Sequence, residues 1–309
     1  MKNKLVIVDL QYMFHRHKYR VQQFEEKNGT YMMNDSHGRE TARLYFTLKD
    51  LAAILSTAAR NGEDIVICMD SKSERKEENT DYKANRHGLG ELDAAALDNI
   101  EYVIRKSELP VMKEAGFEAD DLVGAVIRNR YDEYEHILVY TPDADLCVYV
   151  DDKVSILRYK SVYSKRATFL AAHAVITKET FSGLMSDELK TQMPYNAIML
   201  YKCTVGDKSD NIKGITGFGP AAFGKFICNV AHAGVDITKL TTAEEVERVL
   251  NLFRPNLGDK GVNEALASLE LVKGRTNEEI ESNAKNLSIS IPDMNKFRAA
   301  CIEFDIKSL

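Results

Sequence analysis

Residues 205–220 read VGDKSDNIKGITGFGP, and two kinds of chemistry meet in this stretch. Its first half carries Asp207 and Asp210, two carboxylates one helical turn apart that can reach the same hard cation. Its second half is a glycine-rich turn that ends in Pro220, a residue suited to the first position of a new helix. Glycines let backbone N–H groups approach an anion closely, and the start of a helix favours negative charge. The stretch therefore predicts metal-dependent chemistry on a molecule with a phosphate backbone.

Three apolar runs in the first half of the chain predict buried strands, and carboxylates follow each of them. The runs span residues 5–8, 65–69 and 136–140, and the carboxylates are Asp9, Asp70, Asp143 and Asp145. Between the first two runs, leucines at steps of three and four over residues 40–61 predict a helix that Gly62 ends. Strands that alternate with a helix indicate a parallel α/β sheet, whose ligands bind at the carboxyl ends of the strands. Taken singly, each of these aspartates would be read as a turn or cap residue.

A further group of carboxylates opens another predicted helix. Glu118, Asp120 and Asp121 stand within four residues, and ordinary helix-start chemistry explains one or two of them but not three. Two carboxylates about 4 Å apart repel by roughly 4 kcal/mol at an effective dielectric near 20, so a cleft that gathers many needs cations. Ligand sets made only of oxygen suit Mg²⁺ or Mn²⁺ rather than zinc, and two such ions can drive phosphodiester hydrolysis. The full acidic set is Asp9, Asp70, Glu118, Asp120, Asp121, Asp143, Asp145, Asp207 and Asp210.

Residues 71–90, SKSERKEENTDYKANRHGLG, are charged and carry no helical stripe. One interpretation is a solvated loop or an exposed helix, as for most such runs. The other is a mobile basic segment over the site, in which Tyr82 stacks on a base while Lys83 and Arg86 meet phosphates. Lys83 would then supply a positive charge for the scissile phosphate. In the same interpretation the remaining basic residues of the segment, Lys72, Arg75 and Lys76, would also meet phosphates.

Bulk composition narrows the class of protein only loosely. The chain has 309 residues and a net charge of −6, which argues weakly against a passive nucleic-acid binder. Its five cysteines are scattered and never form a CxxC pair, so neither a zinc site nor a disulfide framework is expected. The apolar run at the N-terminus is too short for a signal peptide or a membrane span, and we expect a cytoplasmic protein without a membrane partner.

The composition changes after about residue 166, and from residue 173 onward the apolar spacing predicts helices. We place a domain boundary near residue 172. An α/β domain, residues 1–172, precedes it, and a helical domain, residues 173–309, follows it.

Several motifs occur in a fixed order up to residue 220: VDL with Arg16 after it, Asp70 after its strand, YKANR at 82–86, FEADD at 117–121, TPDADL at 141–146, and GDKSDNIKGITGFGP at 206–220. In these motifs and their order the chain resembles the 5′-nuclease family of flap endonucleases and 5′→3′ exonucleases, most closely its short, free-standing phage type. The last motif alone is highly specific, whereas FEADD or TPDADL alone would be weak.

The resemblance implies a fold and an activity. The fold is a PIN-like, mostly parallel sheet flanked by helices, with an arch segment at about 71–95, followed by a helical DNA-binding domain with a helix-three-turn-helix. The activity is two-metal cleavage near a free 5′ end of flaps, nicks or primer RNA–DNA hybrids during replication, with ribonuclease H activity included. Mg²⁺ is the expected metal and Mn²⁺ its substitute. A separate DNA polymerase or single-strand-binding protein is the expected partner, in the host cytoplasm if the chain is phage-encoded.

The resemblance also implies roles for residues. Asp70, Glu118 and Asp120 match ligands of the catalytic metal, with Asp9 beside them. Asp143, Asp145, Asp207 and Asp210 match the second metal site, and Asp121 lies between the two. Lys83 and Arg86 match the base of the arch. Gly214 and the turn formed by Gly217, Phe218 and Gly219 match a loop that grips duplex phosphates, with a monovalent cation such as K⁺. The family usually has a basic residue directly after the proline, where this chain has Ala221, and Lys225 is the nearest replacement.

Two other classes of protein remain open on the sequence. A haloacid-dehalogenase-like phosphatase needs a nucleophilic DxD after the first strand, but Gln11 stands where the second aspartate belongs. A nuclease-silent, structure-specific DNA-binding module would tolerate the loss of carboxylates, yet none of the expected ones is missing. The choice between a DNA flap and primer RNA as the main substrate is also left open.

Overall fold

The computed structural model describes residues 1–85, 88–141, 143–159 and 173–306, except the side chains of residues 187 and 188. The predicted site residue Arg86 and the predicted domain boundary near residue 172 lie outside these ranges. Within them, none of the helices has the length and apolar character needed to span a bilayer.

The centre of the molecule is a six-stranded sheet in the order β3-β2-β1-β4-β5-β6. Five strands are parallel and β6 runs antiparallel to β5. Their bounds are Lys2–Asp9 for β1, Asp64–Cys68 for β2, Val111–Met112 for β3, Tyr134–Tyr140 for β4, Val154–Tyr159 for β5 and His173–Ile176 for β6. The mostly parallel α/β sheet that the apolar runs predict is therefore confirmed.

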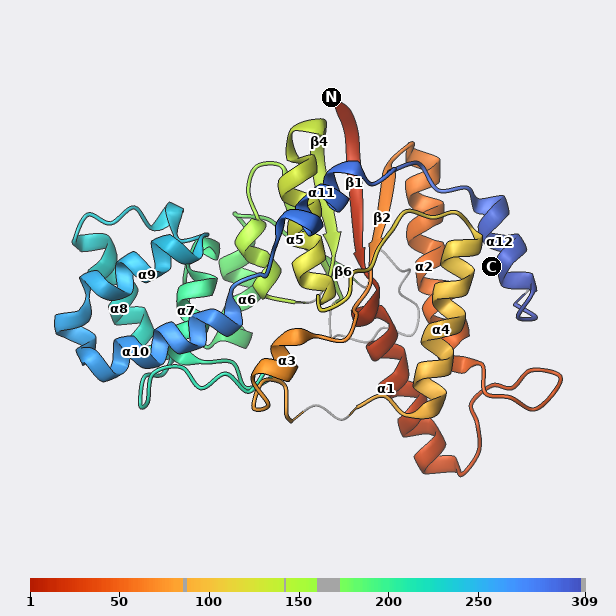
Figure 1. The fold of residues 1–309 in the computed structure, drawn as a ribbon, viewed down its shortest axis with the longest axis horizontal. Helices are drawn as coiled ribbons and strands as arrows, with labels where there is room; N and C mark the ends of the chain where they lie inside the picture. Colours follow the sequence, from red (N-terminus) through yellow and green to blue (C-terminus); the bar gives the residue numbers. More distant parts are fainter. Residues whose placement is uncertain (86–87, 142, 160–172, 307–309) are drawn as a thin grey trace.

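Both faces of the sheet are covered, because successive side chains of a strand point to opposite sides. Leu5 and Ile7 of β1 join one apolar core, and Val6 and Val8 join the other. Helices α5 and α11 cover the first face, and helices α1, α2, α4 and α12 cover the second (Figure 1). Their bounds are Leu10–Asn28 for α1, Ala42–Asn61 for α2, Glu91–Lys106 for α4, Ala119–Arg130 for α5, Glu278–Asn286 for α11 and Met294–Ile302 for α12. Gly62 ends α2 at a φ of 66°, as its sequence predicts.

One predicted element is wrong. The spacing predicts helices from residue 173 onward, but His173–Ile176 is strand β6, with Val175 opposite Leu157 of β5. The run HAVI buries His173 and Ile176 and exposes Val175, so the strand lies with part of its length toward solvent. His173 also holds the strand in place, because its Nε2 lies 3.1 Å from the hydroxyl of Tyr140 in β4. A four-residue run is too short for its period to be distinguished from the start of the following helix.

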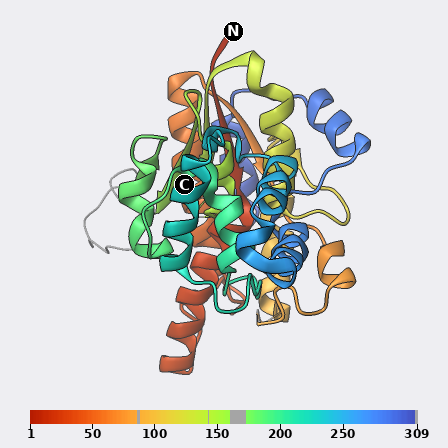
Figure 2. The same ribbon diagram turned by 90° about the vertical axis from the view of Figure 1, so that its left-hand side faces the viewer.

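The helices after β6 form a second group beside the sheet, in front of it in Figure 2. They are α6 Phe181–Leu189, α7 Ile198–Val205, α8 Pro220–His232, α9 Ala243–Leu252 and α10 Arg254–Val272. The core on the α5 side of the sheet continues into this group through residues such as Leu200, Phe223 and Val262. After α10 the chain returns to the sheet, where α11 packs on α5 and α12 packs on α2 and α4. The division of the chain near residue 172 stays a prediction.

A candidate metal centre at the carboxyl edge of the sheet

Parallel pairing brings the first two predicted ligands together. Asp9 ends β1 opposite Cys68, and Asp70 follows β2 by two residues. Asp9 also begins α1, because its Oδ1 accepts the backbone N–H of Tyr12 at 3.2 Å, so it is the cap residue as well as a predicted ligand. Its Oδ2 accepts the hydroxyl of Thr141 at 2.9 Å. Burial, and then the charge of Asp70, raise the pKa of Asp9 to about 7, so this pocket disfavours an uncompensated negative charge.

The start of α5 is connected to the same edge. The backbone N–H of Ala119 donates to Asp70 Oδ1 at 2.7 Å, which fixes the first turn of the helix beside β2. Within that turn, the backbone N–H of Glu118 donates to Asp121 Oδ2 at 3.2 Å. Burial, and then the neighbouring charge of Asp121, raise the pKa of Asp120 well above its usual range. Glu118, Asp120 and Asp121 are therefore placed near Asp70, as predicted from the order of strands and helix.

Asp145, Asp207 and Asp210 form the tightest carboxylate cluster among the described residues. One oxygen of each can be chosen so that all lie within 4.8 Å of one another. Asp145 begins a short 3-10 helix, Asp145–Tyr149, after β4, and the other two follow α7. The backbone hydrogen bonds between Asp207 and Ile212, both 2.8 Å, close the loop that presents these two carboxylates. The two carboxylates of residues 207–210, which are predicted to bind one cation, are thus joined by a third from the segment after β4.

The sequence reading missed Lys202, a buried lysine of α7 that faces this cluster. Its Nζ lies 2.6 Å from Asp207 and 3.9 Å from Asp143, and it also pairs with Asp145. Burial raises the pKa of Asp207, but the ammonium and the hydrogen bonds from Ser209 outweigh it and lower that pKa to about 2. For Asp145, burial prevails and raises the pKa to about 7. The only clue in the sequence was its place five residues before Asp207.

Arg75 and Lys83 compensate the negative charge of Glu118, Asp121 and Asp210. Arg75 Nη1 donates to Glu118 at 3.0 Å and its Nη2 pairs with Asp121, while Lys83 Nζ lies 2.9 Å from Glu118 and 3.8 Å from Asp210. Lys83 therefore bridges the two carboxylate groups. Arg75, expected among the residues that meet phosphates, is only 2% exposed. Tyr82 is also buried, with its hydroxyl 3.0 Å from Glu118, so in this conformation its ring has no face free for a base.

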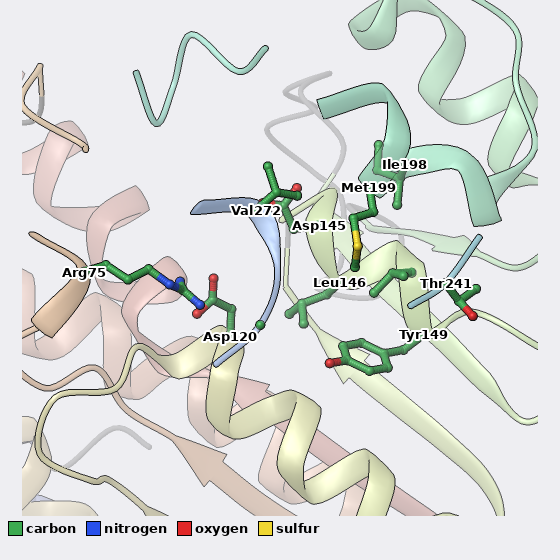
Figure 3. Close-up of a pocket in the computed structure, with 11 residues that line it drawn as sticks. Arg75, Asp120, Asp145, Leu146, Tyr149, Ile198, Met199, Thr241 and Val272 are labelled. Atoms are coloured by element: carbon green, nitrogen blue, oxygen red, sulfur yellow. The ribbon is translucent and has the colours of Figure 1, made fainter. Parts of the chain in front are cut away.

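The two carboxylate groups open into one hollow of about 50 Å³, which is room for a few water molecules. Figure 3 shows Arg75 reaching toward Asp120 on one side of it and Asp145 on the other. The remaining wall is largely apolar and comes from the 3-10 helix, α7 and the end of α10; its residues include Leu146, Tyr149, Met199 and Val272. Asp120 and Asp145, one from each carboxylate group, thus line the same small space beside an apolar wall.

The donor chemistry of this hollow fits divalent cations that prefer oxygen. The predicted ligands are all carboxylates, no histidine or cysteine among the described residues lines the hollow, and a lysine ammonium already lies among three of them. A position that holds an ammonium between carboxylates is one where a positive ion is stabilised.

The glycine turn lies between α7 and α8. Gly214 has a φ of 65° and packs directly on the backbone of Thr204 and Gly206, while Gly217 has a φ of 78° in open space. Phe218 packs edge-on against Phe226 of α8, with 5.9 Å between ring centroids, and Gly219 precedes Pro220 at the first position of that helix. Ala221 and Lys225 are both exposed on α8, four residues apart and on one face. Glu264 of α10, which the sequence reading missed, accepts the backbone N–H of Thr216 at 2.8 Å and its hydroxyl at 2.9 Å.

We expect Gly214→Ala to destabilise the turn far more than Gly217→Ala. A left-handed φ costs an alanine about 1–2 kcal/mol at either position. At Gly214 the new Cβ would also lie 2.5 Å from the backbone nitrogen of Gly206 and 2.6 Å from the carbonyl oxygen of Thr204, whereas at Gly217 nothing lies within 4 Å. Overpacking adds about 1–3 kcal/mol, so urea unfolding should show a loss of roughly 3 kcal/mol for Gly214→Ala and about half of that for Gly217→Ala. Equal losses would contradict the packing described here.

The side chain of Arg16 is held by Asp50 and two tyrosines. Its guanidinium pairs with Asp50 and lies 4.4 Å from the ring centroid of Tyr159, and Nη1 donates to the hydroxyl of Tyr140 at 3.4 Å. Its predicted contact with DNA stays a prediction.

Comparison with protein families and curated sequences gives a consistent result. Residues 4–180 match the model of the 5′-3′ exonuclease N-terminal, resolvase-like domain. A 5′-3′ exonuclease of Aquifex aeolicus is 24% identical over 277 residues, which cover 90% of this chain and 86% of that protein. A 5′-3′ exonuclease of Bacillus subtilis is 32% identical over 234 residues, which cover 73% of this chain and 70% of that protein. DNA polymerase I of Mycobacterium tuberculosis is 33% identical over 147 residues, or 48% of this chain, but this match covers only 15% of the polymerase.

The fold has counterparts among solved structures. The 5′-exonuclease of bacteriophage T5, in a structure with bound zinc, aligns with a TM-score of 0.50 and 18% identity over 88% of this chain and all of that one. A flap endonuclease of the same phage, in a complex with DNA and metal ions, aligns with a TM-score of 0.50 and 15% identity over 87% of this chain and 99% of that one. At this identity the likeness shows the fold, which is PIN-like.

Proposed function

The chain belongs to the 5′-3′ exonuclease family and is a nuclease, and from this premise we propose that it cleaves nucleic acids near free 5′ ends with two divalent metal ions. The observation that supports the metal centre most strongly is the cluster of Asp145, Asp207 and Asp210, which joins the carboxyl edge of the sheet to the glycine turn. The second set, Asp9, Asp70, Glu118 and Asp120, opens into the same hollow through Asp120. Mg²⁺ is the proposed metal and Mn²⁺ its substitute.

The predicted ligands are assigned to two ion sites. Asp70, Glu118 and Asp120, with Asp9 beside them, would hold one ion, and Asp143, Asp145, Asp207 and Asp210 would hold the other. Ions bound there would activate a water molecule and stabilise the leaving oxygen of the phosphodiester. Lys83, placed between Glu118 and Asp210, holds a positive charge beside the position of the scissile phosphate. The apolar wall of Leu146, Met199 and Val272 limits the water that reaches this space.

The glycine turn is the proposed grip on the duplex. Gly217 and Gly219 leave backbone N–H groups accessible, and α8 begins directly behind them. A monovalent cation such as K⁺ would assist this contact, and Lys225 would supply the positive charge that Ala221 does not. Substrates with a duplex on one side and a free 5′ end on the other, such as flaps, nicks or primer RNA–DNA hybrids, fit a grip that stands apart from the acidic hollow. A DNA polymerase or a single-strand-binding protein would act as a separate partner.

Incubation with a 5′-labelled flap duplex tests this function. We expect short labelled products in Mg²⁺ and none when EDTA removes the metal, because the carboxylates need cations to approach a phosphate. Replacing the flap by an RNA primer annealed to DNA ranks the two substrate classes by their rates. Cleavage that continues in EDTA would contradict the metal mechanism. Binding of the flap without cleavage at any metal concentration would instead indicate a nuclease-silent module.

A further inference from the structure

Three donors hold Asp121. Its Oδ1 accepts the backbone N–H of Arg275 at 2.7 Å and pairs with Arg75, while its Oδ2 accepts the backbone N–H of Glu118. The side chain is 2% exposed. A carboxylate whose two oxygens are both engaged by protein donors is suited to fix its neighbours in place. Asp121 therefore connects the acidic hollow to the segment that contains Arg275.

That segment, residues 273–276, is the connector between α10 and α11. Besides the N–H of Arg275, it offers the carbonyl of Lys273 to Arg75 Nη2 at 3.1 Å. The guanidinium of Arg275 forms a two-pronged pair with the carboxylate of Glu78, which belongs to the short helix α3, Glu74–Glu78. In Figure 1 the connector is the blue loop that leaves α10 and passes α5. The connector thus contacts the base of the predicted arch segment and the start of α5 at once.

The middle of α10 contacts the glycine turn. Glu264 of α10 holds Thr216 by two hydrogen bonds, and Gly261 packs against Ile215. From Glu264 to Lys273 the helix rises about 13 Å. Past its kink at Gly258, α10 is regular, and it packs along α7, which carries Lys202. One helix therefore contacts the turn through its middle and continues into the connector at its C-terminal end.

We propose that α10 and the connector form a mechanical coupling that transmits binding of a duplex at the glycine turn to α3 and Asp121. Arg275 and Glu78 form the releasable contact of this coupling, and Arg75 is the positioning residue that sets Glu118 and Asp121. The proposal rests on the proposed function, because it assigns the turn to duplex binding. It adds that the position of the arch base depends on whether the turn is occupied.

Hydrogen exchange in EDTA, with a blunt duplex as the probe, tests the coupling without cleavage. In the wild type we expect the duplex to slow exchange at residues 214–219 and also at residues 74–79. In the Arg275→Gln and Glu78→Gln variants, the duplex should still slow exchange at residues 214–219 but should no longer slow exchange at residues 74–79. The exchanged pair Glu78→Arg with Arg275→Glu should restore the slowing of exchange at residues 74–79. Lys273→Gln is the matched control, because it removes the same charge from the connector but its side chain pairs with Glu270 instead.

Kinetics on the flap give a second measurement. Arg275→Gln should lower kcat at least about fivefold, in the range of typical coupling energies, with KM within about twofold of the wild type. Unfolding should be unchanged, because the Glu78 carboxylate is 61% exposed and such pairs contribute little to stability. The coupling would be overturned if the duplex still slowed hydrogen exchange at residues 74–79 in Arg275→Gln. It would also be overturned if the exchanged pair did not restore that slowing. A wild type in which the duplex protects 214–219 but not 74–79 would overturn it too, and would leave the nuclease function intact. A duplex that protects neither segment would contradict the proposed function itself.

Discussion

Asp145→Asn should abolish cleavage of a flap duplex while the protein still folds and binds the duplex. Asp145 lies at the centre of the proposed second ion site, within 4.8 Å of ligand oxygens of Asp207 and Asp210 and paired with Lys202. Asparagine keeps the shape of the side chain but removes the charge that a cation needs. Because a metal ion contributes several kcal/mol to the stabilisation of charge in the transition state, we expect the rate to fall by at least about 10³-fold.

The matched control for this substitution is Asp152→Asn. Asp152 is an aspartate of the same loop region, but its side chain is 82% exposed and pairs with Lys178 on the surface. Single-turnover cleavage in saturating Mg²⁺ measures the effect, and binding of the flap in EDTA measures retention of the fold. The account would fail if Asp145→Asn cleaved within tenfold of the wild type, or if Asp152→Asn lost as much activity.

Lys83→Ala should slow cleavage by about 10²- to 10³-fold, the range for loss of one positioned charge at a reacting centre. The Nζ of Lys83 lies 2.9 Å from Glu118 and 3.8 Å from Asp210, and burial lowers its pKa less than the surrounding carboxylates raise it, so the side chain stays charged. Its backbone has a φ of 52°, and its N–H donates to the carbonyl of Asp210 at 2.9 Å. Alanine leaves this backbone contact in place and removes only the ammonium.

Lys72→Ala is the control for this second substitution. Lys72 lies at the start of the same charged segment, but its side chain is 85% exposed and pairs with Glu77. A loss of kcat in Lys83→Ala with little change in the affinity for flap DNA would agree with a role at the scissile phosphate. A loss of affinity alone, with kcat retained, would mean that Lys83 only binds the substrate.

The sequence predicted the sheet because parallel strands buried on both faces read as apolar runs, and three such runs ended beside aspartates. It predicted the acidic residues for the same reason, since strand ends of a parallel sheet meet at one edge. Asp207 and Asp210 follow α7 rather than a strand, and in the structure they cluster with Asp145 from the segment after β4. The two-site assignment of the metal ligands, and the contacts of Arg16 and Lys225 with DNA, stay predictions.

What the sequence could not show is where the compensating cations lie. Lys202 sits in a helix whose other residues are mostly apolar, and Arg75 lies in a charged run that reads as solvated surface. Both are buried only because distant segments surround them. Lys273, the connector residue whose carbonyl bonds to Arg75, lies 198 positions further along the chain. Such long-range contacts leave no local pattern. β6 was missed for the opposite reason, because four residues give too little pattern to read.

Titration of the wild-type chain with Mn²⁺, followed through the electron paramagnetic resonance signal of the free ion, tests the metal centre most directly. The account predicts two bound ions per chain, as in two-metal nucleases, and the loss of one of them in Asp145→Asn but not in Asp152→Asn. A wild type that binds no Mn²⁺ at concentrations that support cleavage, or an Asp145→Asn variant that binds as many ions as the wild type, would contradict it.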